Sequence, residues 1–200
     1  MTSHLLLSAL PLMVIPSALC VNGDLLRSYL PGAVDGFLPE EGQSIFCVAS
    51  NMTYIYDGGY LTYVNQGTVM ALQQFYAKGE SAYFSVTLHL MNSRENASRI
   101  VGYFRGILSS LPTLRDAELG EGGFECSDSS VSYLYFWQDR LFVALEGTRD
   151  LSIQAMRLSG GEILRKALPE ESLCAGLGLG ILCLGSSHLF RRGGGHRQVP

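Results

Sequence analysis

The segment that most constrains the fold is "SAYFSVTLHLM", residues 81–91, in which apolar and other side chains alternate strictly. Successive side chains of a β-strand point to opposite faces, so this pattern predicts a strand with one apolar face. That face consists of Phe84, Val86, Leu88 and Leu90. The opposite face carries Tyr83, Ser85, Thr87 and His89. A strand of this kind needs neighbouring strands and a layer that packs on its apolar side.

The segments on either side of this strand predict a mixture of strands and helices. Residues 24–43 contain several prolines and glycines and are expected to be irregular. The other expected elements are two short strands within 44–59, a helix from Tyr60 to Gly79, a helix over 92–111, a hairpin of Val131–Trp137 and Leu141–Leu145, and a last helix over 150–168.

Short polar side chains mark where the later helices should begin. Asn92 or Ser93 would cap the helix over 92–111, and Asp150 would cap the last helix, in which Gly160 and Gly161 form a weak point. The short links between neighbouring strands favour antiparallel pairing. The sequence therefore predicts an α+β domain, an antiparallel sheet packed by about three helices.

The first twenty residues predict a signal peptide. An apolar core from Leu5 to Ile15 is followed by Pro16 and small residues, and this core is short for a membrane span. Cleavage after Cys20 would leave Ala18 and Cys20 at the small-residue positions. A lipoprotein in which Cys20 is acylated and a buried N-terminal helix are the two alternatives.

Two of the five cysteines, Cys47 and Cys126, lie in the central domain. In an exported protein they would either form one disulfide that closes a long loop or remain two buried thiols. They are not arranged as a C-x-x-C pair, and His89 is the one histidine of the central domain, so a metal site is not expected.

The charge pattern and the polar residues exclude several classes of function. The net charge is -4 and the basic residues are scattered, so no nucleic-acid partner is expected. The sequence contains neither G-x-S-x-G nor S-x-x-K, and no two carboxylates can be placed together for acid–base work. We predict an ordinary half-exposed His89, and no catalytic residue, cofactor or metal.

Tyrosine, phenylalanine and tryptophan residues occur in two blocks, within 54–63 and 133–137. Such residues either complete the core of a small sheet domain or line a binding cleft. If a pocket exists between the two blocks, the residues expected to form it are Tyr60, Tyr63, Asn65 and His89.

Parts of the central domain resemble a family of bacterial exported proteins that carry a domain of unknown function. Members have a helix of the type Leu-Tyr-x-Tyr-Ile-Asn-Gly-Ala-Ala-Glu and, after a strand, Met-Gly-Ser-x-Glu-Asn-Ala. The matching segments here are "YLTYVNQGTVMALQQF" at 60–75 and "LMNSRENASRIVGYF" at 90–104. The resemblance implies export and an α+β domain, and no known reaction.

The segment "PEESLCAGLGLGILCLGSSHLFRR", residues 169–192, resembles a bacterial PEP-CTERM sorting signal. Such signals consist of Pro-Glu-Pro, an apolar stretch rich in glycine and leucine, and a closing arginine cluster. Pro169, Glu170, Arg191 and Arg192 match this pattern, whereas Glu171 replaces the second proline. The resemblance implies an exosortase-like sorting enzyme as partner. The glycines of this run indicate an apolar membrane helix rather than a phosphate-binding loop.

The residues from Leu173 to Phe190 are just enough to span a thin bilayer as a helix. Arginines after the span would stay in the cytoplasm, with the central domain on the outside. A plain C-terminal helix packed on its own domain is the alternative. The expected organisation is a signal peptide at 1–20, an exported domain at 21–168, a sorting and anchor segment at 169–192, and a cytoplasmic tail at 193–200.

Three functions are compatible with these features. The leading expectation is a protein of the cell envelope or extracellular matrix, anchored first in the inner membrane, whose domain is non-enzymatic and binds a ligand or serves a structural role. The second is an envelope hydrolase or redox protein with a pocket between its aromatic blocks. The third is a eukaryotic secreted glycoprotein, because Asn51 and Asn96 lie in N-x-S/T triplets.

Overall fold

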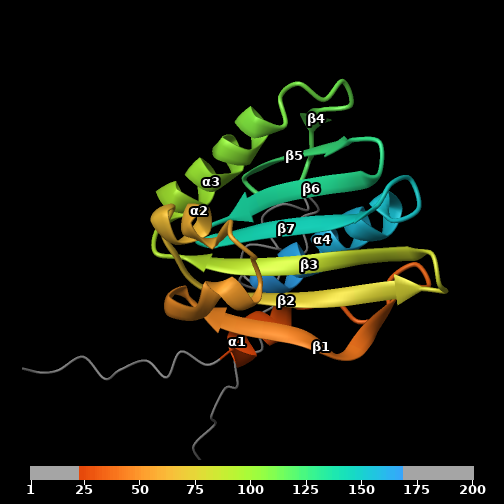
Figure 1. The fold of residues 1–200 in the computed structure, drawn as a ribbon, viewed down its shortest axis with the longest axis horizontal. Coiled ribbons are helices and arrows are strands. Elements are labelled where there is room, and N and C mark those ends of the chain that lie inside the picture. The colour runs from red at the N-terminus through yellow and green to blue at the C-terminus, as the bar shows by residue number, and fades with distance from the viewer. Residues whose placement is uncertain (1–22, 169–200) are drawn as a thin grey trace, which may run out of the picture. The chain divides into compact units, whose positions relative to one another are not determined.

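Seven antiparallel strands form a single sheet in the computed structural model, which describes residues 23–168 (Figure 1). The strand order is β1-β2-β3-β7-β6-β5-β4. In chain order the elements are α1 (Asp24–Tyr29), β1 (Leu38–Val48), the 3₁₀ helix η1 (Ala49–Tyr54), α2 (Tyr60–Asn65), β2 (Thr68–Lys78), β3 (Ala82–Met91), α3 (Arg94–Ile107), β4 (Arg115–Asp116), β5 (Gly122–Ser127), β6 (Val131–Gln138), β7 (Leu141–Thr148) and α4 (Ile153–Ala167). The predicted α+β class with an antiparallel sheet is confirmed.

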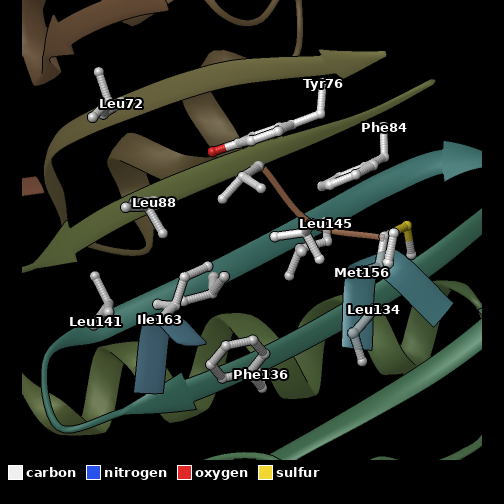
Figure 2. Close-up of a cluster of buried hydrophobic side chains, with 14 of the residues drawn as sticks. Leu72, Tyr76, Phe84, Leu88, Leu134, Phe136, Leu141, Leu145, Met156 and Ile163 are labelled. Carbon is white, nitrogen blue, oxygen red and sulfur yellow. The ribbon is translucent and has the colours of Figure 1, made fainter. Parts of the chain in front are cut away.

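Helices cover both faces of the sheet, and the central strand β7 presents apolar side chains to both helical layers. Leu141, Val143 and Leu145 face the layer of α1 and α4, whereas Phe142 and Ala144 face the layer of α2 and α3. The first layer encloses the larger core, in which Met156 and Ile163 of α4 meet the leucine and aromatic side chains of the sheet (Figure 2).

The core under α1 and α4 is largely apolar, and the hydroxyl group of its buried Tyr76 finds a partner. The Tyr76 ring stacks on Phe84 with ring centroids 4.8 Å apart, and its hydroxyl donates a hydrogen bond to the Pro31 carbonyl oxygen at 2.8 Å. A buried tyrosine hydroxyl without a partner would be destabilising. This bond therefore fastens the segment after α1 to the sheet.

The clearest sequence patterns produce the expected elements. β3 matches the alternating segment, and β6 and β7 form the expected hairpin, with Asp139 in the turn at φ 49°. The predicted helix over 92–111 appears as α3, and Ser93 caps it because its side chain accepts a hydrogen bond from the Asn96 amide at 3.2 Å.

The helix predicted from Tyr60 to Gly79 is wrong beyond Asn65. α2 ends there, Gly67 adopts a φ of +95°, and the chain continues as β2 between β1 and β3. A left-handed backbone favours glycine and ends a right-handed helix. The Gly67 carbonyl also accepts a hydrogen bond from the Asn92 amide at 2.9 Å, which ties the start of β2 to the start of α3.

Further expectations about individual elements are corrected. Residues 24–43 are not wholly irregular, since α1 lies there and β1 already begins at Leu38. The second short strand expected within 44–59 is instead the 3₁₀ helix η1. Ser152, not Asp150, occupies the N-cap position of α4, and that helix continues through Gly160 and Gly161. The described residues thus contain four α-helices rather than about three.

A buried carboxylate joins α4 to strand β5 of the sheet. Glu125 of β5 is 6% exposed and accepts two hydrogen bonds from Arg157 of α4, at 2.8 and 2.5 Å, and another from Arg115. The Arg157 hydrogen bonds hold the pKa of Glu125 below its usual value. The pairing satisfies a charge that would otherwise be costly to bury.

Candidate functional site

The face of the sheet under α2 and α3 carries a cluster of polar and aromatic side chains around His89. β3 contributes His89, β6 contributes Tyr135 and β7 contributes Glu146, whereas Tyr63 comes from α2 and Tyr56 from the residues just before it. We call these five residues the tyrosine–histidine cluster. The β6–β7 register puts Tyr135 opposite Ala144, two residues from Glu146, and the Tyr135 hydroxyl donates a hydrogen bond to the Glu146 carboxyl group.

His89 is fully buried at the centre of this cluster, so the expectation of a half-exposed histidine is wrong. Its ring stacks against Tyr63, with centroids 4.9 Å apart and an interplanar angle of 7°. Tyr63 also stacks on Tyr56, at 3.8 Å. The imidazole is therefore closed in by α2 above it and by the sheet below it.

The contacts of the two ring nitrogens favour one tautomer of His89. The Thr68 hydroxyl donates its one proton to the Met91 sulfur, 3.4 Å away. The same hydroxyl oxygen lies 3.5 Å from His89 Nδ1, and towards that nitrogen it acts as an acceptor. Nδ1 then carries the proton, and Nε2 accepts from the Tyr56 hydroxyl, 2.7 Å away. Burial lowers the pKa of His89 to about 3, so the ring is neutral at neutral pH.

The three tyrosines of the cluster are also held in their neutral forms. Burial raises the pKa values of Tyr56, Tyr63 and Tyr135 above that of free tyrosine, and the nearby Glu146 carboxyl group raises them further. Burial likewise raises the pKa of Glu146, although the hydrogen bond from Tyr135 acts in the opposite direction. The cluster thus consists of a neutral imidazole, three protonated tyrosine hydroxyl groups and one buried carboxyl group, without a deprotonated tyrosine.

A pocket of about 330 Å³ opens above this cluster, between α2 and α3. Its walls are aromatic: Tyr63 lies 5.5 Å from Phe104, and Phe104 lies 5.4 Å from Tyr103, measured between ring centroids. Apolar and small polar residues complete the lining, which consists of Ile55, Tyr56, Asp57, Gly59, Thr62, Tyr63, Tyr103, Phe104 and Ile107. We call this cavity the aromatic pocket.

The structure brings together two of the four residues predicted for a pocket. Tyr63 and His89 are in contact, whereas Tyr60 packs against the buried Cys47 and Met52 instead, and Asn65 is exposed at the end of α2. The sequence analysis did not assign Tyr56, Tyr135 or Glu146 to the site. One signal could have found Glu146, because it is the single charged residue in the apolar run 141–147 of β7.

The disulfide between Cys47 and Cys126 is not formed, and the alternative of two buried thiols holds. Cys47 lies in β1 and Cys126 in β5, which are five strand spacings apart in the sheet. At about 4.8 Å per spacing this separation far exceeds the roughly 6 Å between the Cα atoms of a disulfide. Burial raises the pKa of both thiols, that of Cys126 to about 11, so neither is a reactive thiolate.

Other predicted features can be located only in part. Pro169, Glu170, Arg191 and Arg192 of the sorting segment and Cys20 of the leader lie outside the described residues. Between residues 23 and 168 no helix is long and apolar enough to cross a membrane. The same part of the chain contains no group of three or more side chains suited to hold a metal ion.

Replacing Tyr56 by phenylalanine is expected to lower the free energy of unfolding by about 1–2 kcal/mol, because His89 Nε2 then loses its buried donor. Chemical denaturation of the variant and the parent protein measures this difference. Tyr54→Phe is the matched control: Tyr54 is 71% exposed, and its replacement is expected to change stability by less than about 0.5 kcal/mol. Equal effects of the two substitutions would contradict the role given to the Tyr56 hydroxyl.

No protein-family model matches this chain, and no curated protein is significantly similar to it in sequence.

Proposed function

We propose that the central domain is a non-enzymatic domain that binds a small ligand in the aromatic pocket. One observation carries the proposal: an aromatic-walled cavity of about 330 Å³ lies over a cluster of buried hydrogen-bonding groups. Pockets that bind small molecules commonly combine apolar walls with a few fixed polar groups. The pKa values of His89 and the cluster tyrosines lie far from neutral, which disfavours proton transfer by these groups.

Nuclear magnetic resonance of the purified protein with a library of small aromatic and cationic fragments tests this proposal. We expect amide signals of the pocket lining, such as Tyr63, Tyr103 and Phe104, to shift on addition of the fragments that bind. A Phe104→Ala variant should lose these shifts, whereas Phe75→Ala, on the distant half of β2, should keep them. Binding spread evenly over the surface, or no binding at all, would refute the pocket as a ligand site.

We further propose that the protein is exported and delivered to the cell envelope by signals at its two ends. The support is the sequence: a leader at 1–20 and a segment at 169–192 that resembles a PEP-CTERM signal, for which an exosortase-like enzyme would be the partner. Deleting residues 173–190 should release the protein from the membrane fraction of cells. Deleting only 193–200 should leave it there, and unchanged membrane retention in the first variant would refute the anchor.

An envelope hydrolase is the second candidate, and the Glu146 carboxyl group is the observation that favours it. Its pKa is raised by burial, its neighbour Tyr135 donates to it, and it lies near Tyr63. A carboxyl group with a raised pKa can serve as a general acid. Hydrolysis of a panel of chromogenic esters and glycosides that disappears in Glu146→Gln would establish this candidate, and no hydrolysis by the parent protein would remove it.

A further inference from the structure

We infer that the ligand of the aromatic pocket is a small organic cation, of the class of methylated or alkylated ammonium ions. This inference rests on the proposed ligand-binding function and specifies its substrate class. Three properties of the pocket lead to it: aromatic rings in its walls, one carboxylate in its lining, and the absence of any basic side chain from that lining.

The aromatic rings that line the cavity are inclined to one another. Tyr63 and Phe104 are inclined by 37°, and Tyr103 meets Phe104 edge to face at 77°, so the rings do not lie in one plane. Tyr103 is 41% exposed and stands at the rim. Faces of aromatic rings attract ammonium groups, and ligands with methylated nitrogens are bound in cages of this kind.

The charges around the pocket favour a positive ligand. Asp57 is the one residue of the lining with a charged side chain, and it lies on the loop between η1 and α2. The nearest part of α3 carries Arg105, whose guanidinium group is already paired with Asp116 at 2.6 Å. An anion would meet the Asp57 carboxylate without a cation to neutralise it.

The residues beneath the pocket also lack a positive charge that would repel a cation. His89 is neutral, with a pKa near 3, so no imidazolium repels a bound ammonium group. Beneath the pocket the tyrosine hydroxyl oxygens and the Glu146 carboxyl oxygens are electron-rich acceptors. A positive ligand above them is therefore stabilised by the ring quadrupoles and by these dipoles.

Titration calorimetry of the purified protein with choline and with its neutral isostere 3,3-dimethylbutan-1-ol tests the inference. The two probes have nearly the same shape and differ in one positive charge. We expect choline to bind at millimolar concentration and the alcohol to bind at least several-fold more weakly. Equal or tighter binding of the alcohol would overturn the cation assignment while retaining the pocket as a ligand site. If neither probe binds and the fragment library also shows no binding, both the proposed function and this inference are refuted. If the fragments bind but neither probe does, only this inference is refuted.

Two variants, each with a matched control, test separately the contribution of the Asp57 carboxylate and that of an aromatic ring to choline binding. Asp57→Asn and Tyr103→Leu are each expected to weaken choline binding about two- to fivefold, the range for one exposed ion pair or cation–π contact. Glu80→Gln, in the β2–β3 turn, and Tyr83→Leu, on β3 near that turn, alter the same residue types at the other end of these strands. We expect these controls to leave binding unchanged, and equal losses in all four variants would overturn the assignment of this pocket.

Discussion

Lowering the pH from 7 to 5 is expected to remove about 2 kcal/mol of folding free energy through His89 alone. The unfolded chain has a histidine pKa near 6.5, and the folded protein lowers it to about 3. Between these values the unfolded state binds a proton that the native state excludes. Stability from this group is therefore fully present above pH 6.5 and is lost progressively as the pH falls towards the folded pKa.

The pH window from 7 to 5 isolates this effect from most carboxyl groups. Glu125 has a folded pKa below its usual value, so its contribution is lost only at more acidic pH. Glu146 acts in the opposite direction: its folded pKa is raised, so its protonation as the pH falls stabilises the native state and reduces the net loss. His89 is the one histidine between residues 23 and 168.

Urea denaturation of the parent protein at several pH values between 7 and 5 gives the required slope. His89→Gln should flatten the dependence of the free energy of unfolding on pH, whatever its effect on absolute stability. Glu146→Gln should make the dependence steeper, because the opposing group is removed. A slope that His89→Gln leaves unchanged would show that the imidazole is not excluded from protonation in the folded state.

Replacing Gly147 by alanine is expected to lower the free energy of unfolding by about 3 kcal/mol or to prevent folding, because the residue lies where the sheet has no room for a side chain. A Cβ atom at this position would lie 2.5 Å from Phe84 Cβ and 2.7 Å from the Tyr83 carbonyl oxygen. Both belong to β3, the hydrogen-bonded neighbour of β7, so the strain cannot be relieved by rotating one flexible side chain.

Gly161→Ala is the matched control for this substitution. No atom lies within 4 Å of a Cβ at Gly161, and the residue is inside α4. Alanine favours a helix over glycine by about 1 kcal/mol, so this variant should be more stable than the parent protein. Thermal unfolding monitored by circular dichroism compares the two. Similar midpoints for both variants would contradict the close approach of β3 to Gly147.

Local sequence patterns correctly predicted strand β3 and helix α3. β3 alternates because one of its faces is apolar and lies in the α4 layer, while the other carries polar side chains such as Thr87 and His89. α3 shows a helical stripe because it covers the sheet with one side. β2 did not show alternation, since Met70, Ala71 and Leu72 are all buried between two neighbouring strands and two layers. A strand with apolar side chains on both faces loses the period of two, so the spacing of β2 resembled that of a helix.

The sequence predicted only those site residues whose type by itself suits a binding cleft. Tyr63 and His89 could be named because polar aromatic residues are suited to a cleft, but their contact depends on Gly67 turning the chain from α2 back into the sheet. Glu146 lies on β7 and Tyr135 on β6, and both strands come much later in the chain than β3, although β7 pairs directly with β3. Their proximity to His89 is a property of strand order, which no local spacing encodes.

The packing of α1 against α4 determines how the domain could be oriented at a surface. The Lys166 ammonium group donates a hydrogen bond to the Leu30 carbonyl oxygen at 2.6 Å, so the first and last described segments lie next to each other on one face of the sheet. The aromatic pocket lies on the opposite face. A ligand in the aromatic pocket would therefore bind on the face of the sheet opposite to the one that carries α1 and α4.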